Sequence, residues 1–159
     1  MLILEVLLGL KSKQGDVTAT FLHALLGLNK HIYCEMPLGF RIPGKVLKLK
    51  KTLYGLHQSP CAFWKYHVEK MAICGMVQSK LDPCLFVGEK VICISYVDDL
   101  IFWACNEKDI HHIAMKLREV GVNLEQETDA AGFLGIRMER DPDTGLFGNE
   151  TGGTHTSYH

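Results

Sequence analysis

The stretch from Val91 to Ala104, VICISYVDDLIFWA, constrains the fold more than any other part of the chain. Two runs of β-branched, aliphatic and aromatic residues flank the acidic pair Asp98 and Asp99, and such runs are typical of strands. The pair falls where a tight hairpin would turn. Adjacent carboxylates repel each other, and apolar surroundings raise the free-energy cost of ionising both. The stretch therefore predicts either an Asp-Asp turn exposed to water or a site where a cation neutralises the pair.

Length and composition indicate one globular domain with a sizeable core, since the chain has 159 residues, of which 47% are hydrophobic and 22% charged. The formal net charge of -1 is mild evidence against a nucleic-acid binder, which often carries a basic excess. No apolar stretch is long enough to span a bilayer. The six cysteines include no CxxC pair, which argues against a zinc site and fits reduced thiols in the cytosol or nucleus.

Apolar periodicity and turn residues predict the elements around this hairpin. The apolar start, residues 1–10, is typical of the end of a buried helix or strand. Further helices are expected over 18–28, from Ser59 as N-cap to about Cys74, and over 107–120 after Asn106. Strands or extended segments are expected up to Asp16 and over 32–40, 46–50, 84–87 and 133–139. Antiparallel strands with helices on one face make this an α+β fold.

Three aspartates are candidates for a common site. Asp16 ends an extended segment, so it would converge with Asp98 and Asp99 if the two strands were neighbours in one sheet. Convergent carboxylates suit Mg²⁺, which takes oxygen ligands, and two such ions can support a phosphoryl displacement. Lysines at 45, 48, 50 and 51 form the densest positive patch and could contact phosphates. Taken singly, Asp16 also fits a helix N-terminal carboxylate, and each lysine a solvated strand face.

The chain resembles the palm of the reverse transcriptase of copia-type LTR retrotransposons. The resemblance is carried by six stretches in the order of that family, and it spans roughly residues 14 to 146. They are DVTATFLHA (16–24), IYCEMPLGF (32–40), KLKKTLYGLHQSP (48–60), SKLDPCLFV (79–87), ISYVDDLIFWA (94–104) and FLGIRMERDPDTG (133–145). The YVDD box alone would be weak, whereas six ordered stretches together are specific.

The resemblance implies a role for each matching position. Asp16 and Asp98 match the two principal metal-binding aspartates, Asp99 supports them, and the carbonyl of Val17 would also bind a metal. The expected cofactor is a pair of Mg²⁺ ions, or Mn²⁺. The remaining positions are assigned as follows: Tyr54 and Gly55 to the incoming nucleotide, and Tyr96, Val97, Phe133, Leu134, Gly135, Lys48, Lys50 and Lys51 to the primer and template.

The implied reaction copies an RNA or DNA template by extending a DNA primer with dNTPs. The resemblance also implies departures from the family, since the fingers, thumb and RNase H segments are expected to be missing from this chain. Residues 1–146 are expected to form a partial palm and 147–159 a disordered, non-homologous tail. The localisation expected from the resemblance is cytoplasmic, in virus-like particles, or nuclear, with no membrane.

Three functions remain open on these grounds. The first is an RNA-directed DNA polymerase palm. The second is an inactive retrotransposon remnant, from which little or no primer extension and poor solubility are expected. The third is a cyclase-like palm with other phosphoryl chemistry, which fits less well because the YGLHQSP and FLGI stretches match polymerase positions beyond the metal ligands.

Overall fold

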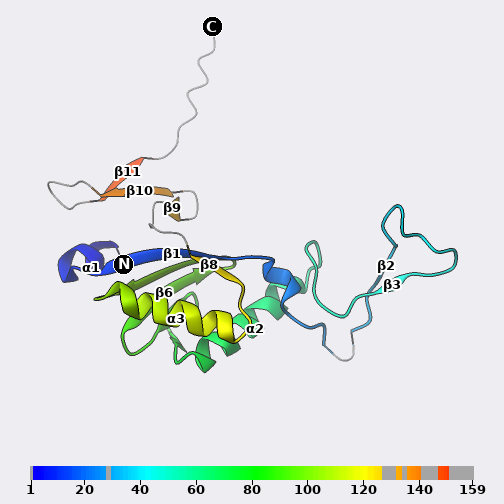
Figure 1. The fold of residues 1–159 in the computed structure, drawn as a ribbon, viewed down its shortest axis with the longest axis horizontal. Helices are drawn as coiled ribbons and strands as arrows, with labels where there is room; N and C mark the ends of the chain where they lie inside the picture. Colours follow the sequence, from blue (N-terminus) through cyan, green and yellow to red (C-terminus); the bar gives the residue numbers. More distant parts are fainter. Residues whose placement is uncertain (1, 28–29, 127–131, 134–135, 141–146, 151–159) are drawn as a thin grey trace, which may run out of the picture.

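The computed structural model describes residues 2–27, 30–126, 132–133, 136–140 and 147–150, and its centre is a six-stranded antiparallel sheet (Figure 1). In spatial order the strands are β4 (Val77–Gln78), β5 (Leu85–Val87), β6 (Val91–Tyr96), β7 (Asp99–Ala104), β1 (Lys11–Val17) and β8 (Leu124–Gln126). Two helices, α2 (Ser59–Ile73) and α3 (Glu107–Glu119), cover one face. The α+β architecture predicted from the sequence is confirmed.

The core lies between the sheet and the two helices. Phe102 of β7 and Phe86 of β5 are fully buried there, against Phe63 and Met71 of α2 and Leu117 of α3. Strand β7 is buried on both faces, because Ile101 and Trp103 on the opposite face are each 2% exposed. This explains why residues 100–104 form an unbroken apolar run instead of alternating with polar residues.

The central hairpin is present, with one correction to its turn. Tyr96 pairs with Asp99, so the two turn residues are Val97 and Asp98, and Asp99 is the first residue of β7. The prediction that both aspartates form the turn was therefore wrong by one residue. The cause is the two-residue loop length that a tight hairpin favours, which places Asp99 in the ladder.

The N-terminal segment departs from the prediction at two points. Residues 2–8 do form a helix, α1 (Leu2–Leu8), but this helix is not buried as expected: it buries Glu5 and leaves Ile3 and Leu7 exposed. The helix expected over 18–28 is only a single 3₁₀ turn, η1 (Thr20–Leu22). It is preceded by Ala19 in a left-handed conformation, and the following chain turns away because the Leu26 amide donates to the Lys50 carbonyl (3.1 Å).

The two long helices agree well with the sequence pattern. Helix α2 ends where Gly75, at φ 85°, allows the left-handed conformation of a C-terminal cap. Its N-cap is Gln58, and the Ser59 hydroxyl instead donates to the Leu53 carbonyl (2.6 Å), so the assignment of Ser59 as N-cap was wrong. Helix α3 follows Asn106 and buries Ile110, as expected.

An extended arm, residues 30–51, leaves the compact part of the molecule between η1 and α2 (Figure 1). It contains the two-residue strands β2 (Tyr33–Cys34) and β3 (Leu47–Lys48), which pair with each other and are shorter than the sequence predicted. Among the described residues the arm has no third strand, so neither β2 nor β3 pairs with another strand on its outer edge. No helix in the described part of the chain is long and apolar enough to cross a membrane.

The C-terminal part contains a second sheet of three strands, β9 (Gly132–Phe133), β10 (Ile136–Arg140) and β11 (Phe147–Glu150). The single strand expected over 133–139 was correct only from Ile136 on, because Phe133 belongs to β9, which pairs antiparallel with β10 through Ile136. The disorder expected over 147–159 was wrong for 147–150, which pair with β10. The turn expected over 141–145, and the residues from 151 to 159, lie outside the described residues.

Candidate functional site

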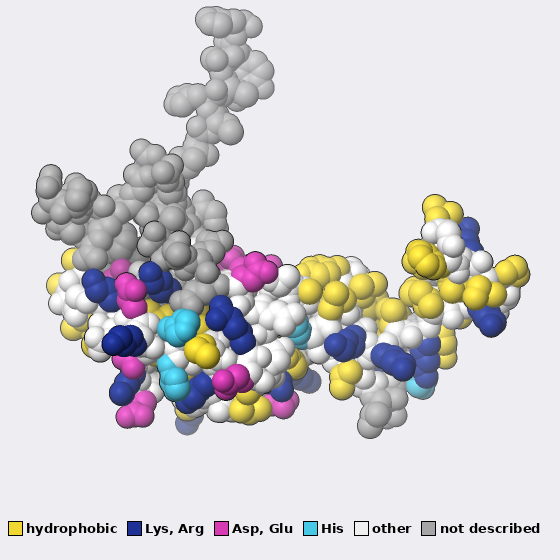
Figure 2. Space-filling model, viewed as in Figure 1, with side chains coloured by type: hydrophobic (Ala, Val, Ile, Leu, Met, Phe, Trp, Pro, Cys, Tyr) yellow, Lys and Arg dark blue, Asp and Glu magenta, His cyan; other side chains and the backbone are white. Residues whose placement is uncertain are grey.

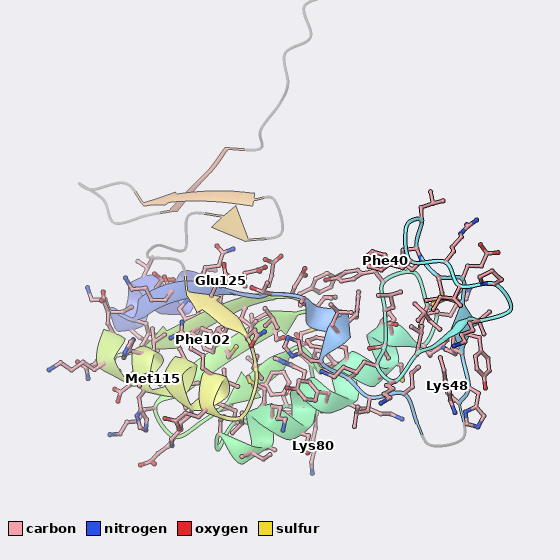
Figure 3. All side chains as sticks on the ribbon, turned by 45° about the vertical axis from the view of Figure 1, so that its right-hand side comes forward. Phe40, Lys48, Lys80, Phe102, Met115 and Glu125 are labelled. Atoms are coloured by element: carbon pink, nitrogen blue, oxygen red, sulfur yellow. The ribbon has the colours of Figure 1, made fainter. Side chains whose placement is uncertain are left out.

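The central sheet places three carboxylate-bearing residues in one row. Asp16 of β1 lies opposite Asp99 of β7 on one side and opposite Glu125 of β8 on the other. Directly opposed residues of an antiparallel pair carry their side chains on the same face. Because Val17 is 1% exposed and belongs to the core, Asp16 and its two partners lie on the face away from α2 and α3. Figure 3 shows Glu125 on this upper side and Met115 of α3 below the sheet.

The turn of the hairpin brings Asp98 to the same end of the sheet. The Val17 amide donates to the Asp98 carbonyl (2.9 Å), which joins the turn to the end of β1. The side chain of Asp98 is exposed, and those of Asp16 and Asp99 are half-buried. The convergence of Asp16, Asp98 and Asp99 predicted from the sequence is therefore present at the level of the backbone.

The turn depends on an unusual backbone conformation at Val97. Its φ is 56°, whereas Asp98 does not have a positive φ, which is the pattern of a type II′ turn. A β-branched residue in this region costs on the order of 1–3 kcal/mol. The six cross-strand pairs between β6 and β7 hold the turn in that conformation. Tyr96, the residue before it, is 53% exposed on the same face as Asp99.

The Val17 carbonyl is already engaged inside the protein. The hydroxyl of Thr20, itself fully buried, donates to this carbonyl oxygen at 2.5 Å. A carbonyl oxygen has two lone pairs and can accept from more than one partner. The left-handed Ala19 between them reverses the chain so that Thr20 can reach back.

The site offers oxygen donors, which is the ligand type that Mg²⁺ prefers. Within the described ranges, no group of three or more His, Cys, Asp and Glu side chains is gathered closely enough to hold a metal ion. Asp16, Asp98 and the Val17 carbonyl all supply oxygen donors, so their chemistry fits Mg²⁺ even though the described side chains do not form such a group. Asp16 and Asp99 also have further interactions inside the protein and are not free.

The loop at Tyr54 and Gly55 lies beside the segment that follows β1. The Tyr54 ring meets Phe21 of η1 edge to face, with 4.7 Å between the ring centroids, and is 55% exposed. Gly55 has a φ of 89°, which requires glycine. Phe21 also contacts Phe63 of α2 (6.1 Å), so one aromatic cluster fixes the position of this loop relative to the end of β1.

The residues predicted to contact primer and template are less closely gathered. Lys48 lies on β3, on the arm that projects from the sheet (Figure 3), and Lys50 and Lys51 follow it at the base of the arm. Phe133 is the last residue of β9, whereas Leu134 and Gly135 lie outside the described residues.

A buried polar pair lies beneath the hairpin and was not predicted from the sequence. The Ser95 hydroxyl of β6 and the His67 Nε2 of α2 are hydrogen-bonded at 2.9 Å, and neither residue is exposed to solvent. Burial lowers the pKa of His67 to about 4, and its Nδ1 has no hydrogen-bond partner among the described residues. The only sequence signal was a histidine on the apolar stripe of α2.

Glu125 was not predicted from the sequence either, because the polar segment NLEQE (123–127) carries no strand pattern.

Comparison with known proteins gives consistent matches. A family model described as reverse transcriptase (RNA-dependent DNA polymerase) matches residues 2–147. The chain is 32% identical over 141 residues, 84% of its length, to a retrovirus-related Pol polyprotein from transposon RE1 of Arabidopsis thaliana. It is 35% identical over 109 residues, 64% of its length, to that from transposon TNT 1-94 of Nicotiana tabacum. A Ty1 Gag-Pol polyprotein of Saccharomyces cerevisiae is 29% identical over 134 residues, 79% of the chain. The matches cover 8 or 9% of these relatives.

Proposed function

We propose, because this chain belongs to the reverse transcriptase family of copia-type retrotransposons, that the end of its central sheet is a nucleotidyl-transfer site. The observation that supports this most is the pairing of Asp16 with Asp99, together with the hydrogen bond from the Val17 amide to the Asp98 carbonyl. Those contacts join two segments more than 80 residues apart at one sheet end, on the face free of α2 and α3.

Asp16 and Asp98 would hold two Mg²⁺ ions, with the Val17 carbonyl as a further ligand and Asp99 beside them. Such ions, when bound, favour deprotonation of an attacking hydroxyl and neutralise charge on the phosphates. The strained turn at Val97 fixes the direction of Asp98 before any substrate binds. The backbone that carries Asp98 is therefore preorganised, which favours catalysis.

The surrounding residues would position the substrates of primer extension. Tyr96 and Val97 would lie under the primer terminus, and Tyr54 and Gly55 under the incoming dNTP. The primer 3′-hydroxyl would attack the α-phosphorus of the dNTP, forming a phosphodiester bond and releasing pyrophosphate. Phe133, Leu134 and Gly135 would contact the primer strand, and Lys48, Lys50 and Lys51 the nucleic-acid backbone.

An inactive remnant of the same family is the alternative, and two observations favour it. The acidic side chains of the described part are not gathered into a three-residue metal group. Large apolar side chains are also exposed at places remote from the site, including Ile3 (75%), Leu7 (73%) and Leu38 (83%). Binding of metal and extension of a primer must therefore be measured separately.

Metal binding tests the carboxylate site without requiring turnover. Titration with Mn²⁺, followed by the electron paramagnetic resonance signal of the free ion, should show that Asp98→Asn weakens binding at least about tenfold. Asp16→Asn should have the same effect. Glu89→Gln, which removes an exposed carboxylate in the turn before β6, is the matched control and should leave the affinity unchanged. Equal Mn²⁺ affinity in the wild-type chain and both aspartate variants would rule out the site.

Primer extension on poly(rA) with oligo(dT) and Mg²⁺ then separates the polymerase from the remnant. The inactive-remnant alternative predicts little or no extension by the 159-residue chain, whereas a working nucleotidyl-transfer site predicts extension. Strong extension that Asp98→Asn abolishes would contradict the remnant alternative. A cyclic product formed from an NTP without primer would instead contradict transfer to a primer and support the cyclase-like chemistry.

A further inference from the structure

The peptide group between Val17 and Thr18 has a fixed orientation at the end of β1. The Thr18 amide donates to the Asn123 carbonyl just before β8 (2.9 Å). Because the C=O and N–H of a trans peptide point in opposite directions, the Val17 carbonyl oxygen points away from β8. The Val17 amide donates to the Asp98 carbonyl on the other side of β1 (2.9 Å). The Val17 carbonyl oxygen is therefore directed toward the hairpin turn that carries Asp98.

The hydroxyl of Thr20 lies at this same oxygen. It donates to the Val17 carbonyl at 2.5 Å, the short end of the range for O–H···O hydrogen bonds. Thr20 is fully buried, and a hydrogen bond is electrostatically stronger in the protein interior than in water. The left-handed Ala19, at φ 56°, reverses the chain so that the hydroxyl reaches back three residues. The contact is thus built into the backbone and is protected from water.

A metal ion that binds the Val17 carbonyl would have to share the oxygen with this hydroxyl or displace it. Sharing weakens the bond to the ion, because the hydroxyl draws on the electron density of the same oxygen. Displacement leaves a buried hydroxyl without its acceptor, and an unsatisfied buried donor costs free energy. Either way, the hydrogen bond from Thr20 opposes the metal.

We infer that Thr20 is a positioning residue that lowers the affinity of the site for Mg²⁺, because its hydroxyl competes with the ion for the Val17 carbonyl oxygen. This role rests on the proposed function, in which that oxygen is a metal ligand. The carboxylates of Asp16 and Asp98 would bind the ion with or without the hydroxyl. The expected effect is therefore a weaker site and not a lost one.

Titration of the 159-residue chain with Mn²⁺, followed by electron paramagnetic resonance of the free ion, tests this role. Thr20→Val keeps the shape of the side chain and removes the hydroxyl, so it should tighten Mn²⁺ binding about fivefold, the worth of one released hydrogen bond. Thr20→Ser keeps the hydroxyl and should retain the wild-type affinity. Equal or weaker binding by Thr20→Val would overturn the inference.

Thr52→Val is the matched control. Thr52 is also buried, and its hydroxyl donates to the Phe21 carbonyl in the same segment, which is not a proposed ligand. This variant should leave Mn²⁺ affinity unchanged, and equal tightening in both variants would show general loosening and overturn the role of Thr20. Should Thr20→Val lack the far-ultraviolet circular dichroism of a folded chain, Thr20→Ala replaces it and should bind about fivefold more tightly than Thr20→Ser.

Acidic side chains also lie at several places on the surface of the compact part (Figure 2). They can bind Mn²⁺ weakly, so the specific affinity is taken as the difference between each Thr20 variant and the same variant with Asp98→Asn. Tightening that persists in full with Asp98→Asn would place the effect outside the aspartate site and overturn the inference.

The competition is reciprocal, because two ligands of one oxygen oppose each other equally. Thr20→Val should therefore destabilise the chain less in saturating Mn²⁺ than in EDTA, by the same fivefold factor, about, in the unfolding equilibrium constant measured with urea. Thr52→Val should destabilise it equally in both. An equal loss for Thr20→Val in both conditions would contradict competition.

Failure of this inference and failure of the proposed function are distinguishable. If Asp98→Asn leaves Mn²⁺ affinity unchanged, the proposed metal site itself is wrong. If Asp98→Asn weakens binding but Thr20→Val does not tighten it, the metal site stands and only the role of Thr20 is wrong.

Discussion

At the scale of the single residue, the hairpin beside the candidate site rests on a buried polar contact. His67 packs among Phe63, Trp64 and Phe86, and hydrogen-bonds to Ser95, two residues before the turn. A histidine buried in this way is held neutral, because burial disfavours the imidazolium form. The contact attaches α2 to β6 immediately beneath the turn that carries Asp98.

The lowered pKa of His67 predicts a pH-dependent stability. The folded pKa is about 4 and the unfolded value is 6.5, so the unfolded chain takes up the proton first as pH falls. Stability is therefore fully present above pH 6.5 and is lost between pH 6.5 and 4. Urea unfolding should show a His67 contribution that falls by about 2 kcal/mol from pH 7 to pH 5.

The His67 contribution is isolated by comparing variants at each pH. His67→Phe, combined with Ser95→Ala to avoid an unpaired buried hydroxyl, should flatten the pH profile by that amount. His111→Gln, at an exposed position of α3, should keep the wild-type profile. An unchanged slope in the double variant would show that His67 does not titrate in this range.

At the scale of elements, the site depends on close packing of β1 between β7 and β8. Gly15, the residue before Asp16, faces the core beside the side chain of Leu124 on the neighbouring strand β8. A Cβ placed on Gly15 would lie 2.8 Å from the Cδ1 atom of Leu124 and 3.4 Å from the Glu125 carbonyl oxygen. Glycine therefore permits the approach that sets Glu125 opposite Asp16.

Gly15→Ala is expected to destabilise the protein by about 1 kcal/mol, because Leu124 is only 4% exposed and its neighbours restrict its movement. In a Leu124→Ala background the same change should cost nothing, which a double-mutant cycle of chemical unfolding measures. Gly27→Ala, where nothing lies within 4 Å, is the control and should be neutral or slightly stabilising. Additive free energies in the cycle would contradict a steric cause.

At the scale of the whole molecule, apolar surface is exposed at both ends of the described structure. Helix α1 exposes Ile3, Leu7 and Leu8, and the arm exposes Leu38 and Phe40. Scattered apolar residues are common on protein surfaces, but clusters of this kind promote association. At the other side of α1, the buried carboxylate of Glu5 accepts hydrogen bonds from Trp103 (2.8 Å) and Ser12 (2.8 Å), so the helix itself is firmly attached.

We therefore expect the isolated chain to be poorly soluble and to self-associate. Light scattering coupled to size-exclusion chromatography should show mass increasing with concentration. Ile3→Lys with Leu7→Lys should raise the concentration at which association begins by at least about tenfold, since each exposed aliphatic side chain is worth more than about 1 kcal/mol when buried and about 1.4 kcal/mol is a tenfold change. A monodisperse wild-type sample that melts cooperatively would contradict this prediction.

The sequence by itself determined the hairpin over 91–104, the helices α2 and α3 and the family, because strand and helix periodicity and ordered motifs are local properties of the chain. It also selected Asp16, Asp98 and Asp99. It could not identify β8 or β11, whose short polar segments have no periodicity of their own, nor the contact between His67 and Ser95. The expected helix over 18–28 failed for a different reason: its local pattern is helical, but the Leu26 amide hydrogen-bonds to Lys50 in a distant segment.

Only the tertiary structure decided which residues meet. The strand register put Asp99 in the ladder opposite Asp16, moved the turn to Val97 and Asp98, and added Glu125 to the row. Register and crossing contacts arise from packing between segments far apart in the chain, and a single sequence carries no direct record of them. The acidic hairpin thus follows from the sequence alone, whereas its alignment with β1 follows from the fold.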